Sequence, residues 1–269
     1  MTSGLRQYLV GLLLLATLAG CGGYFSREER AAWRGDAERR CFAAGLVQPS
    51  DFMVVAREID GPGSCGMDKP IRISAISQAT VAMKPIATLN CPATAHFEAW
   101  LRESVQPAAM QWFGQQVVSV HQMSTYACRS RNNVRGAKIS EHAYGNAIDV
   151  GGFTLADGRQ VKVVSGWRGA PDERGFFQDI LWGACERFRT VLAPGSDRYH
   201  YNHMHLDLAM HDPRGQRRYC RPKPVPPASQ PDPVYTSSIG SLITKFVGEP
   251  EDGIPPGEKP DWPRFVEPE

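Results

Sequence analysis

The chain has 269 residues, of which 42% are hydrophobic and 22% are charged, so it can bury a core and is not wholly disordered. Its length is enough for one or two ordinary domains. Thirty lysines and arginines against 28 aspartates and glutamates give a formal charge of +2. Nucleic-acid-binding proteins usually carry a strong basic excess, so we expect no nucleic-acid partner.

The first twenty residues are typical of a secretion signal. Arg6 provides the positive start, and the apolar run 8–19 is shorter than the about 20 residues that a membrane-spanning helix needs. The run ends in Leu-Ala-Gly-Cys at 18–21, which resembles the lipobox of bacterial lipoproteins. We therefore predict a signal peptide over 1–20 and a lipidated Cys21. A plain signal peptide with a cysteine nearby is the alternative.

The residue after the predicted lipidated cysteine is Gly22 and not an aspartate. In Gram-negative bacteria this pattern favours export to the outer membrane. We expect a protein of the bacterial cell envelope that is anchored to the membrane by lipid and faces the periplasm. A short linker, 21–26, would lead from the anchor to the folded domain.

Hydrophobic periodicity divides the rest of the chain into elements. Segment 47–72 is rich in loops. Helices are predicted at 26–45, 94–105, 108–113 and 172–192. Strands are predicted at 116–123, in a hairpin of 146–153 with 160–165, and at 203–210. These elements predict an α+β domain over 27–221, with helices flanking a small antiparallel sheet. Twelve of the 21 prolines fall in the last 49 residues, which predicts a flexible tail over 222–269.

Six cysteines remain once Cys21 is assigned to the lipid. An even number in an exported chain indicates disulfides, and six cysteines allow 15 pairings. Each bridge would contribute about 3–4 kcal/mol to stability. We predict the sequential pairing, which is Cys41–Cys65, Cys91–Cys128 and Cys185–Cys220.

Two polar segments carry the residues suited to chemistry: Ser-Glu-His-Ala-Tyr-Gly-Asn-Ala-Ile-Asp at 140–149 and His-Tyr-Asn-His-Met-His-Leu-Asp-Leu at 200–208. If the second segment is a strand, His203, His205 and Asp207 share one face. A catalytic zinc needs three protein ligands and one open position. His142, Asp149 and one histidine of the second segment would satisfy that need. A chance His-x-His without a metal is the alternative.

The pattern Ser-x-His-x-x-Gly-x-Ala-x-Asp with a distal His-x-His resembles the peptidoglycan metallopeptidases related to lysostaphin, D-Ala-D-Ala carboxypeptidases and murein endopeptidase. It is more closely similar to the bacterial extensin-like C-terminal domain family. Cys-Pro at 91–92, Val-Gln-Pro-Ala-Ala at 105–109, Tyr-Ala-Cys-Arg at 126–129 and Gly-Phe at 152–153 add to this likeness. The resemblance covers roughly residues 41–220.

The resemblance implies a role for each matching residue. His142, Asp149 and His205 would bind Zn²⁺, and His203 would lie beside the metal. Arg129 would stabilise the negative charge that develops during hydrolysis. Arg131 is the rival for that role, and a surface ion pair is the alternative for either arginine.

The general base is left open by the sequence. Many relatives carry an acidic residue where this chain has Asn202, and an amide cannot accept a proton at neutral pH. His200 and His203 are the candidates because imidazole titrates near pH 6.5, and Glu141 is a further one. Asp207 would either orient a histidine or be an ordinary strand carboxylate.

These observations predict a zinc metallopeptidase that hydrolyses an amide bond in peptidoglycan stem or cross-link peptides, as an endopeptidase or a carboxypeptidase. The expected cofactor is Zn²⁺, and the expected partners are peptidoglycan and, through lipid, the membrane. A peptidoglycan-binding lipoprotein that has lost hydrolysis is one alternative, and Asn202 favours it. A periplasmic zinc-binding or scaffold protein whose tail recruits partners is another.

Overall fold

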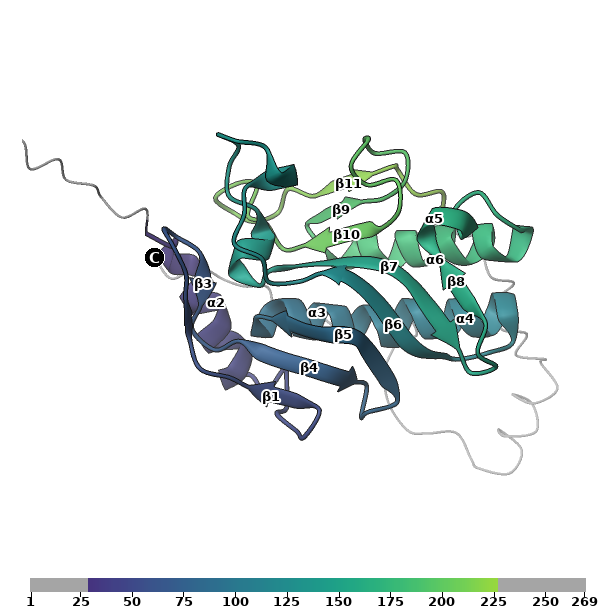
Figure 1. Cartoon of the computed structure of the whole chain (residues 1–269), viewed down its shortest axis with the longest axis horizontal. Coiled ribbons are helices and arrows are strands. Elements are labelled where there is room, and N and C mark those ends of the chain that lie inside the picture. The colour runs from purple at the N-terminus through teal and green to yellow at the C-terminus, as the bar shows by residue number, and fades with distance from the viewer. Residues whose placement is uncertain (1–28, 227–269) are drawn as a thin grey trace, which may run out of the picture. The chain divides into compact units, whose positions relative to one another are not determined.

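A mixed sheet runs through residues 29–226, the part of the chain that the computed structural model describes (Figure 1). Its strand order is β1-β4-β5-β6-β7-β10-β9-β11, with β8 paired to β7. The strands are β1 (Met53–Val55), β4 (Ile71–Ile76), β5 (Val81–Leu89), β6 (Val117–Ser124), β7 (Ala147–Leu155), β8 (Gln160–Lys162), β9 (Thr190–Leu192), β10 (Met204–Asp207) and β11 (Tyr219–Arg221). β2 (Ile59–Asp60) and β3 (Gly66–Met67) form a separate ribbon.

The predicted α+β class is confirmed, but the predicted small antiparallel sheet is wrong. The sheet has nine strands, and the pairs β5–β6 and β9–β11 are parallel. The sequence did not predict strands β1, β4 and β5. Helices connect β5 to β6. Parallel neighbours need such a long crossover connection, because a tight hairpin joins only antiparallel strands.

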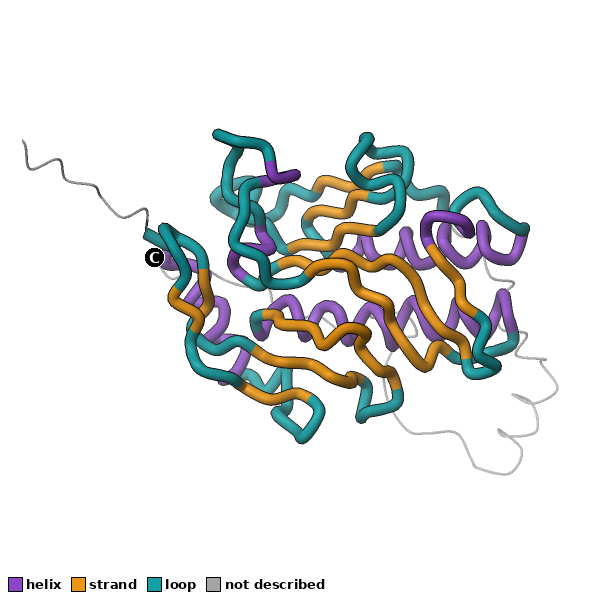
Figure 2. Tube along the Cα trace, in the orientation of Figure 1, coloured by secondary structure: helices purple, strands orange, loops and turns teal. Residues whose placement is uncertain are grey.

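The helices gather behind the sheet, as Figure 2 shows in purple. They are α2 (Ala32–Ala43), α3 (Cys91–Trp100), α4 (Gln106–Phe113), the short α5 (Val163–Gly166) and α6 (Pro171–Arg187). A π-helical turn, η2 (Leu101–Val105), joins α3 to α4, and two 3-10 turns are η3 (Arg131–Asn133) and η4 (Glu141–Tyr144). Phe153 of β7 packs against Trp100 of α3 and Phe176 of α6, with ring centroids 6.3 and 5.5 Å away. The core therefore lies between the sheet and these helices.

Two predicted elements end earlier than expected. The helix predicted over 172–192 stops at Arg187, and Thr190–Leu192 forms β9 between β10 and β11. The second strand of the predicted hairpin stops at Lys162, where α5 begins. In both places strand pairing or packing outweighs an amphipathic pattern that fits more than one structure.

Three disulfides join the six remaining cysteines, and only Cys185–Cys220 was predicted correctly. The other two bridges are Cys41–Cys91 and Cys65–Cys128, so the predicted pairs Cys41–Cys65 and Cys91–Cys128 are wrong. The observed pairs connect elements that are distant in sequence and adjacent in the fold. Spacing along the chain does not reveal such pairs.

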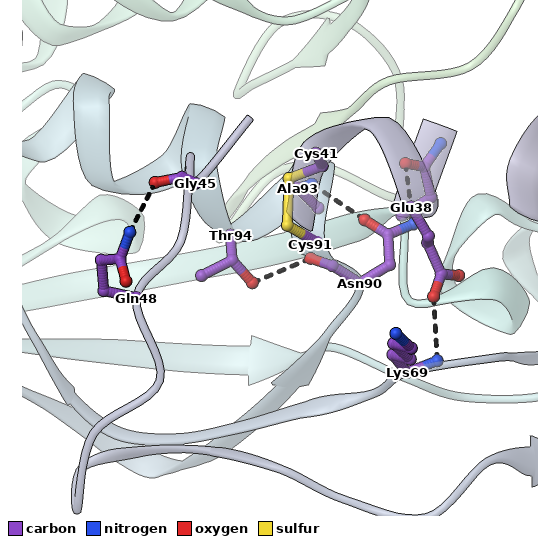
Figure 3. Close-up of a disulfide and its surroundings, with 10 residues drawn as sticks. Glu38, Cys41, Gly45, Gln48, Lys69, Asn90, Cys91, Ala93 and Thr94 are labelled. Atoms are coloured by element: carbon purple, nitrogen blue, oxygen red, sulfur yellow. Dashed lines mark hydrogen bonds between the residues drawn. A yellow bond between two sulfur atoms is a disulfide. The ribbon is translucent and has the colours of Figure 1, made fainter. Parts of the chain in front are cut away.

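The Cys41–Cys91 bridge fastens α2 to the first residue of α3 (Figure 3). Asn90 caps α3 by accepting a hydrogen bond from the Ala93 amide at 2.8 Å. About one turn earlier in α2, the buried Glu38 carboxylate accepts a bond from the Lys69 amide at 2.9 Å. Helix α2 is therefore tied to both ends of the β4–β5 hairpin region.

Several predictions concern residues that the structure does not describe. The signal peptide 1–20, the lipidated Cys21, the linker 21–26 and the tail beyond residue 226 lie outside the described residues. Within residues 29–226, no helix is long and apolar enough to cross a membrane.

Candidate metal centre

Strands β7 and β10 bring the second segment of the predicted site against the first. They are antiparallel, with His205 directly opposite Asp149. Ile148, Val150 and Leu206 belong to the hydrophobic core. Because side chains alternate along a strand, Asp149 and His205 project from the other face of the sheet.

His142 reaches the same place from the short helix η4. The Ser140 side chain caps this turn by accepting a bond from the His142 amide at 3.4 Å. Gly145 then turns the chain towards β7 with a left-handed φ of 59°. A Cβ atom there would lie 2.4 Å from the flexible end of the Met67 side chain and 3.0 Å from the Asn90 backbone nitrogen, so the left-handed φ is the main reason for glycine at this turn.

The three predicted ligands form one buried cluster, whose ligand atoms all lie within 4.8 Å of one another. His142 Nε2 lies 3.2 Å from His205 Nδ1 and 3.1 Å from Asp149 Oδ2. His205 Nδ1 lies 2.8 Å from Asp149 Oδ1. Ligand atoms around a tetrahedral zinc stand about 3.3 Å apart, given metal–ligand distances near 2.0–2.1 Å. The donor set and its spacing therefore fit Zn²⁺.

Each histidine of the cluster has its other ring nitrogen engaged. His142 Nδ1 donates to the Thr125 carbonyl oxygen at 2.7 Å, and His205 Nε2 contacts Asp207 Oδ2 at 2.9 Å. Such contacts fix ring orientation and tautomer in metal sites. Of the two readings left open for Asp207, the structure favours a carboxylate that orients a histidine.

Electrostatics in the cluster reflect the close packing of histidine against carboxylate. Burial would lower the pKa of His205, but hydrogen bonds with Asp149 and Asp207 raise it to about 10. Burial would raise the pKa of Asp149, but bonds from His142 and His205 hold it well below its usual value. Without a metal, His205 therefore stays protonated near neutral pH. A bound metal ion would have to displace that proton.

His203 and His200 lie beside the cluster. His203 Nε2 is 3.6 Å from Asp149 Oδ1, while its Nδ1 donates to Asn202 Oδ1 at 2.9 Å. Burial lowers the pKa of His203 to about 4, so its ring is neutral at pH 7. The His200 ring centroid lies 5.1 Å from that of His203 and 5.8 Å from that of His205.

Asp197 is a site residue that the sequence reading missed. Its Oδ1 accepts a hydrogen bond from His200 Nδ1 at 2.7 Å. Burial would raise the pKa of the Asp197 carboxyl, but this bond together with the bonds from the Tyr199 and His200 amides lowers it. Nothing in the spacing of Asp-x-x-His marks a functional pair, because the contact depends on the local turn. The pair leaves His200 Nε2 as the ring nitrogen not used by Asp197.

Glu141 is not placed as a base, although it lines the pocket. Its carboxylate is held by Arg34 in a two-pronged ion pair at 2.7 and 2.8 Å, and Asn146 donates to it at 2.6 Å. Arg129 has a guanidinium nitrogen 3.8 Å from Asp149 Oδ2, which puts it beside the cluster.

A pocket of about 650 Å³ opens over the cluster. All the predicted catalytic and ligand residues border it, and so does Arg131. The lining residues are Ser124, Arg129, Arg131, Asn132, Asn133, Ser140, Glu141, His142, Asp149, Thr190, Leu192, Asp197, Tyr199, His200, His203, His205, Asp207, His211 and Tyr219.

Comparison with protein families identifies a relationship across most of the described domain. The model of the family described as Extensin-like protein C-terminus matches residues 39–221. The chain belongs to this family. The matched span contains every residue of the cluster and begins five residues after Arg34. No curated protein and no solved structure matches this extensin-like chain.

Proposed function

We propose that this extensin-like protein is a zinc-dependent peptidase of the bacterial cell wall. Its reaction is hydrolysis of an amide bond in peptidoglycan stem or cross-link peptides. The observation that carries this proposal is the buried group of His142, Asp149 and His205 at the floor of an open pocket. Three protein ligands with a solvent-connected side are the arrangement of catalytic rather than structural zinc.

His142 Nε2, His205 Nδ1 and the Asp149 carboxylate would hold the ion. The chemistry that a zinc ion would supply there is a lower pKa, about 7, for a coordinated water, which would make a nucleophile available near neutral pH. Thr125 and Asp207 keep the two imidazoles in the tautomers that ligation needs.

Arg129 would stabilise the negative charge that develops on the scissile carbonyl oxygen. Its guanidinium lies at the edge of the cluster, 3.8 Å from Asp149, and its side chain keeps 25% of its surface exposed to the pocket. A fixed cation at that position costs no reorganisation during the reaction, which is the basis of electrostatic catalysis.

His200 is the general base that the geometry favours. Asp197 holds its Nδ1–H, so Nε2 can accept a proton from the attacking water and return it to the leaving amine. His203 donates its own Nδ1–H to Asn202 and keeps Nε2 near Asp149. It would contribute a neutral ring beside the reacting atoms.

The second candidate function is a peptidoglycan-binding lipoprotein without hydrolysis. Asn202 favours it, because its amide is engaged as an acceptor from His203 and cannot take up a proton. Under either function the predicted place is the cell envelope, with Cys21 as the lipid anchor.

One assay separates the two functions. Purified mature protein with zinc is incubated with cross-linked muropeptides, and the products are identified by mass spectrometry. Peptide cleavage that is lost in His142→Ala supports the peptidase. Binding to peptidoglycan without any product, across pH 5–9 and with zinc bound, supports the second function instead.

A further inference from the structure

We propose that Arg131 forms a carboxylate-binding subsite beside the cluster of His142, Asp149 and His205. The substrate is then a peptide with a free carboxylate close to the scissile amide. This inference rests on the proposed function and specifies its substrate class. It also gives Arg131 a role separate from that of Arg129.

Among the residues that the structure describes, the charges that line the pocket are paired except at Arg131. Each lining carboxylate already has a partner within the described residues: Glu141 pairs with Arg34, Asp149 with His142 and His205, Asp197 with His200, and Asp207 with His205. The Arg131 guanidinium has no such partner within residues 29–226, although the residue borders the pocket. It is the lining cation whose charge is left for a ligand.

Metal binding strengthens this imbalance. A divalent cation offsets the charges of Asp149 and Asp207, and Arg34 offsets Glu141. Asp197 is the remaining lining anion, and it lies against His200. Two cations, Arg129 and Arg131, then border the pocket, and the Asp197 carboxylate is already hydrogen-bonded to His200. A pocket with this balance favours an anionic substrate group over a neutral one.

The loop bearing Arg131 is fixed by its own hydrogen bonds. The Arg131 amide donates to the Lys138 carbonyl at 2.9 Å, and Ser130 forms an isolated bridge with Ile139. The Ser130 hydroxyl also donates to the Val134 carbonyl at 2.7 Å. At the base of the loop, the Cys65–Cys128 disulfide holds the chain.

The tip of the loop has an unusual backbone at two asparagines that border the same pocket. Asn132 and Asn133 have left-handed φ values of 54° and 57°, and both border the pocket. Asparagine tolerates this region better than most residues, and strained backbone of this kind concentrates at functional sites. Asparagine amides can donate hydrogen bonds to the same carboxylate that Arg131 would bind.

The chemistry of the guanidinium selects the ligand. Arginine presents two parallel N–H donors that match both oxygens of a carboxylate, and such charged pairs are stronger than neutral hydrogen bonds. Peptidoglycan stem peptides carry free carboxylates, and converting them to carboxamides removes the charge while keeping the size of the group.

That conversion provides the test. The zinc-loaded full-length mature protein is given a cross-linked muropeptide and the same muropeptide with its free carboxylates amidated. We expect the wild type to favour the acidic substrate by about 10- to 100-fold in kcat/KM, mostly through KM, as loss of a charged hydrogen bond produces. Arg131→Gln should bring that ratio close to one, because kcat/KM falls mainly on the acidic substrate.

Arg135→Gln is the matched control, because Arg135 is exposed in the same loop and does not border the pocket. It should keep the wild-type ratio. Equal use of both substrates by the wild type, or an unchanged ratio in Arg131→Gln, would overturn the subsite.

The proposed function can fail separately. If neither muropeptide is cleaved, the peptidase is wrong, and calorimetric binding of the two muropeptides still tests the subsite. A Kd ratio that favours the acid and disappears in Arg131→Gln supports it, and equal Kd values refute it.

Discussion

Arg34 and Glu141 form a buried two-pronged ion pair across 107 residues of sequence. Their side chains keep only 12% and 7% of their surfaces exposed, and the Arg34 guanidinium stacks 3.6 Å above the Tyr144 ring. Glu141 directly precedes His142. Helix α2, which carries Arg34 from outside the matched family span, thus supports the turn that presents a candidate metal ligand.

Removing Arg34 should therefore cost stability and metal affinity together. Arg34→Met leaves the Glu141 charge buried without its partner, a change that destabilises proteins by about 3–5 kcal/mol. Urea unfolding of the metal-free protein measures it. The double variant Arg34→Met/Glu141→Gln should recover part of the loss, because no unpaired charge remains.

The same helix offers a control for this effect. Arg39 pairs with Asp36 on the surface of α2, with 66% of its side chain exposed. Arg39→Met should change the free energy of unfolding by less than about 1 kcal/mol. If Arg34→Met is equally mild, the buried pair does not support the turn.

The zinc assignment predicts one ion per chain. His142→Ala, Asp149→Ala and His205→Ala should each remove most of the bound metal, since each deletes one of three ligands. Asp207→Asn should retain the ion with about 10- to 100-fold weaker affinity, as loss of an orienting contact does. Elemental analysis and a competing chelator measure both effects. A folded wild type without metal, or three ligand variants that all retain it, would refute the assignment.

Zinc binding should depend on pH in a stated direction. In the metal-free protein the pKa of His205 is about 10, because hydrogen bonds to Asp149 and Asp207 outweigh its burial. At neutral pH the ion must displace that proton, so apparent affinity should rise about tenfold per pH unit below 10. Titrations at pH 6.5, 7.5 and 8.5 in chelator-buffered zinc test this trend. An affinity that stays constant over that range contradicts displacement of a His205 proton.

The cluster of His142, Asp149 and His205 could be predicted because its sequence signals are local. His205 and Asp207 share a strand face by simple alternation, and the small residues around Gly145 indicate a tight turn next to His142. The zinc itself remains a prediction. Support from distant residues could not be found this way, because Arg34 contacts Glu141 only in the folded chain.

The α+β class was predicted correctly, but the size of the sheet and its parallel pairs were not. β6 is rich in valine, and β10 alternates apolar with polar residues. In contrast, β9 continues the helical pattern of α6 and becomes a strand through pairing with β10 and β11. The Cys41–Cys91 bridge depends on where α2 packs, so the even count predicted disulfides without fixing two of the three partners. Long-range packing decides such features, and a single sequence does not encode them locally.

The lipid anchor is a prediction about residues outside the described part of the chain. Metabolic labelling with a fatty-acid probe should tag the wild type and leave Cys21→Ser unlabelled. The two proteins should also differ in membrane fractionation, since multiple acyl chains anchor a protein stably. An unlabelled wild type in the soluble periplasmic fraction would mean that Cys21 is not lipidated.

The last prediction concerns the proton carrier. If His200 is the general base, His200→Ala should lower turnover by about 10²–10⁴-fold while zinc stays bound, because the residue is a neighbour of the cluster and not a ligand. Asp197→Asn should give a smaller loss, since the ring keeps its place and loses only a charged partner.

His203→Ala should reduce turnover with the metal retained. Asn202→Asp should preserve activity or raise it, because it adds a carboxylate next to His203. Rates across pH 5–9, with zinc content measured in parallel, separate these roles. A His200→Ala enzyme that matches the wild type at every pH assigns the base to His203, whose pKa of about 4 places the acid limb of the profile below the measured range. Activity in Asn202→Asp alone would show that the present chain binds peptidoglycan without cleaving it.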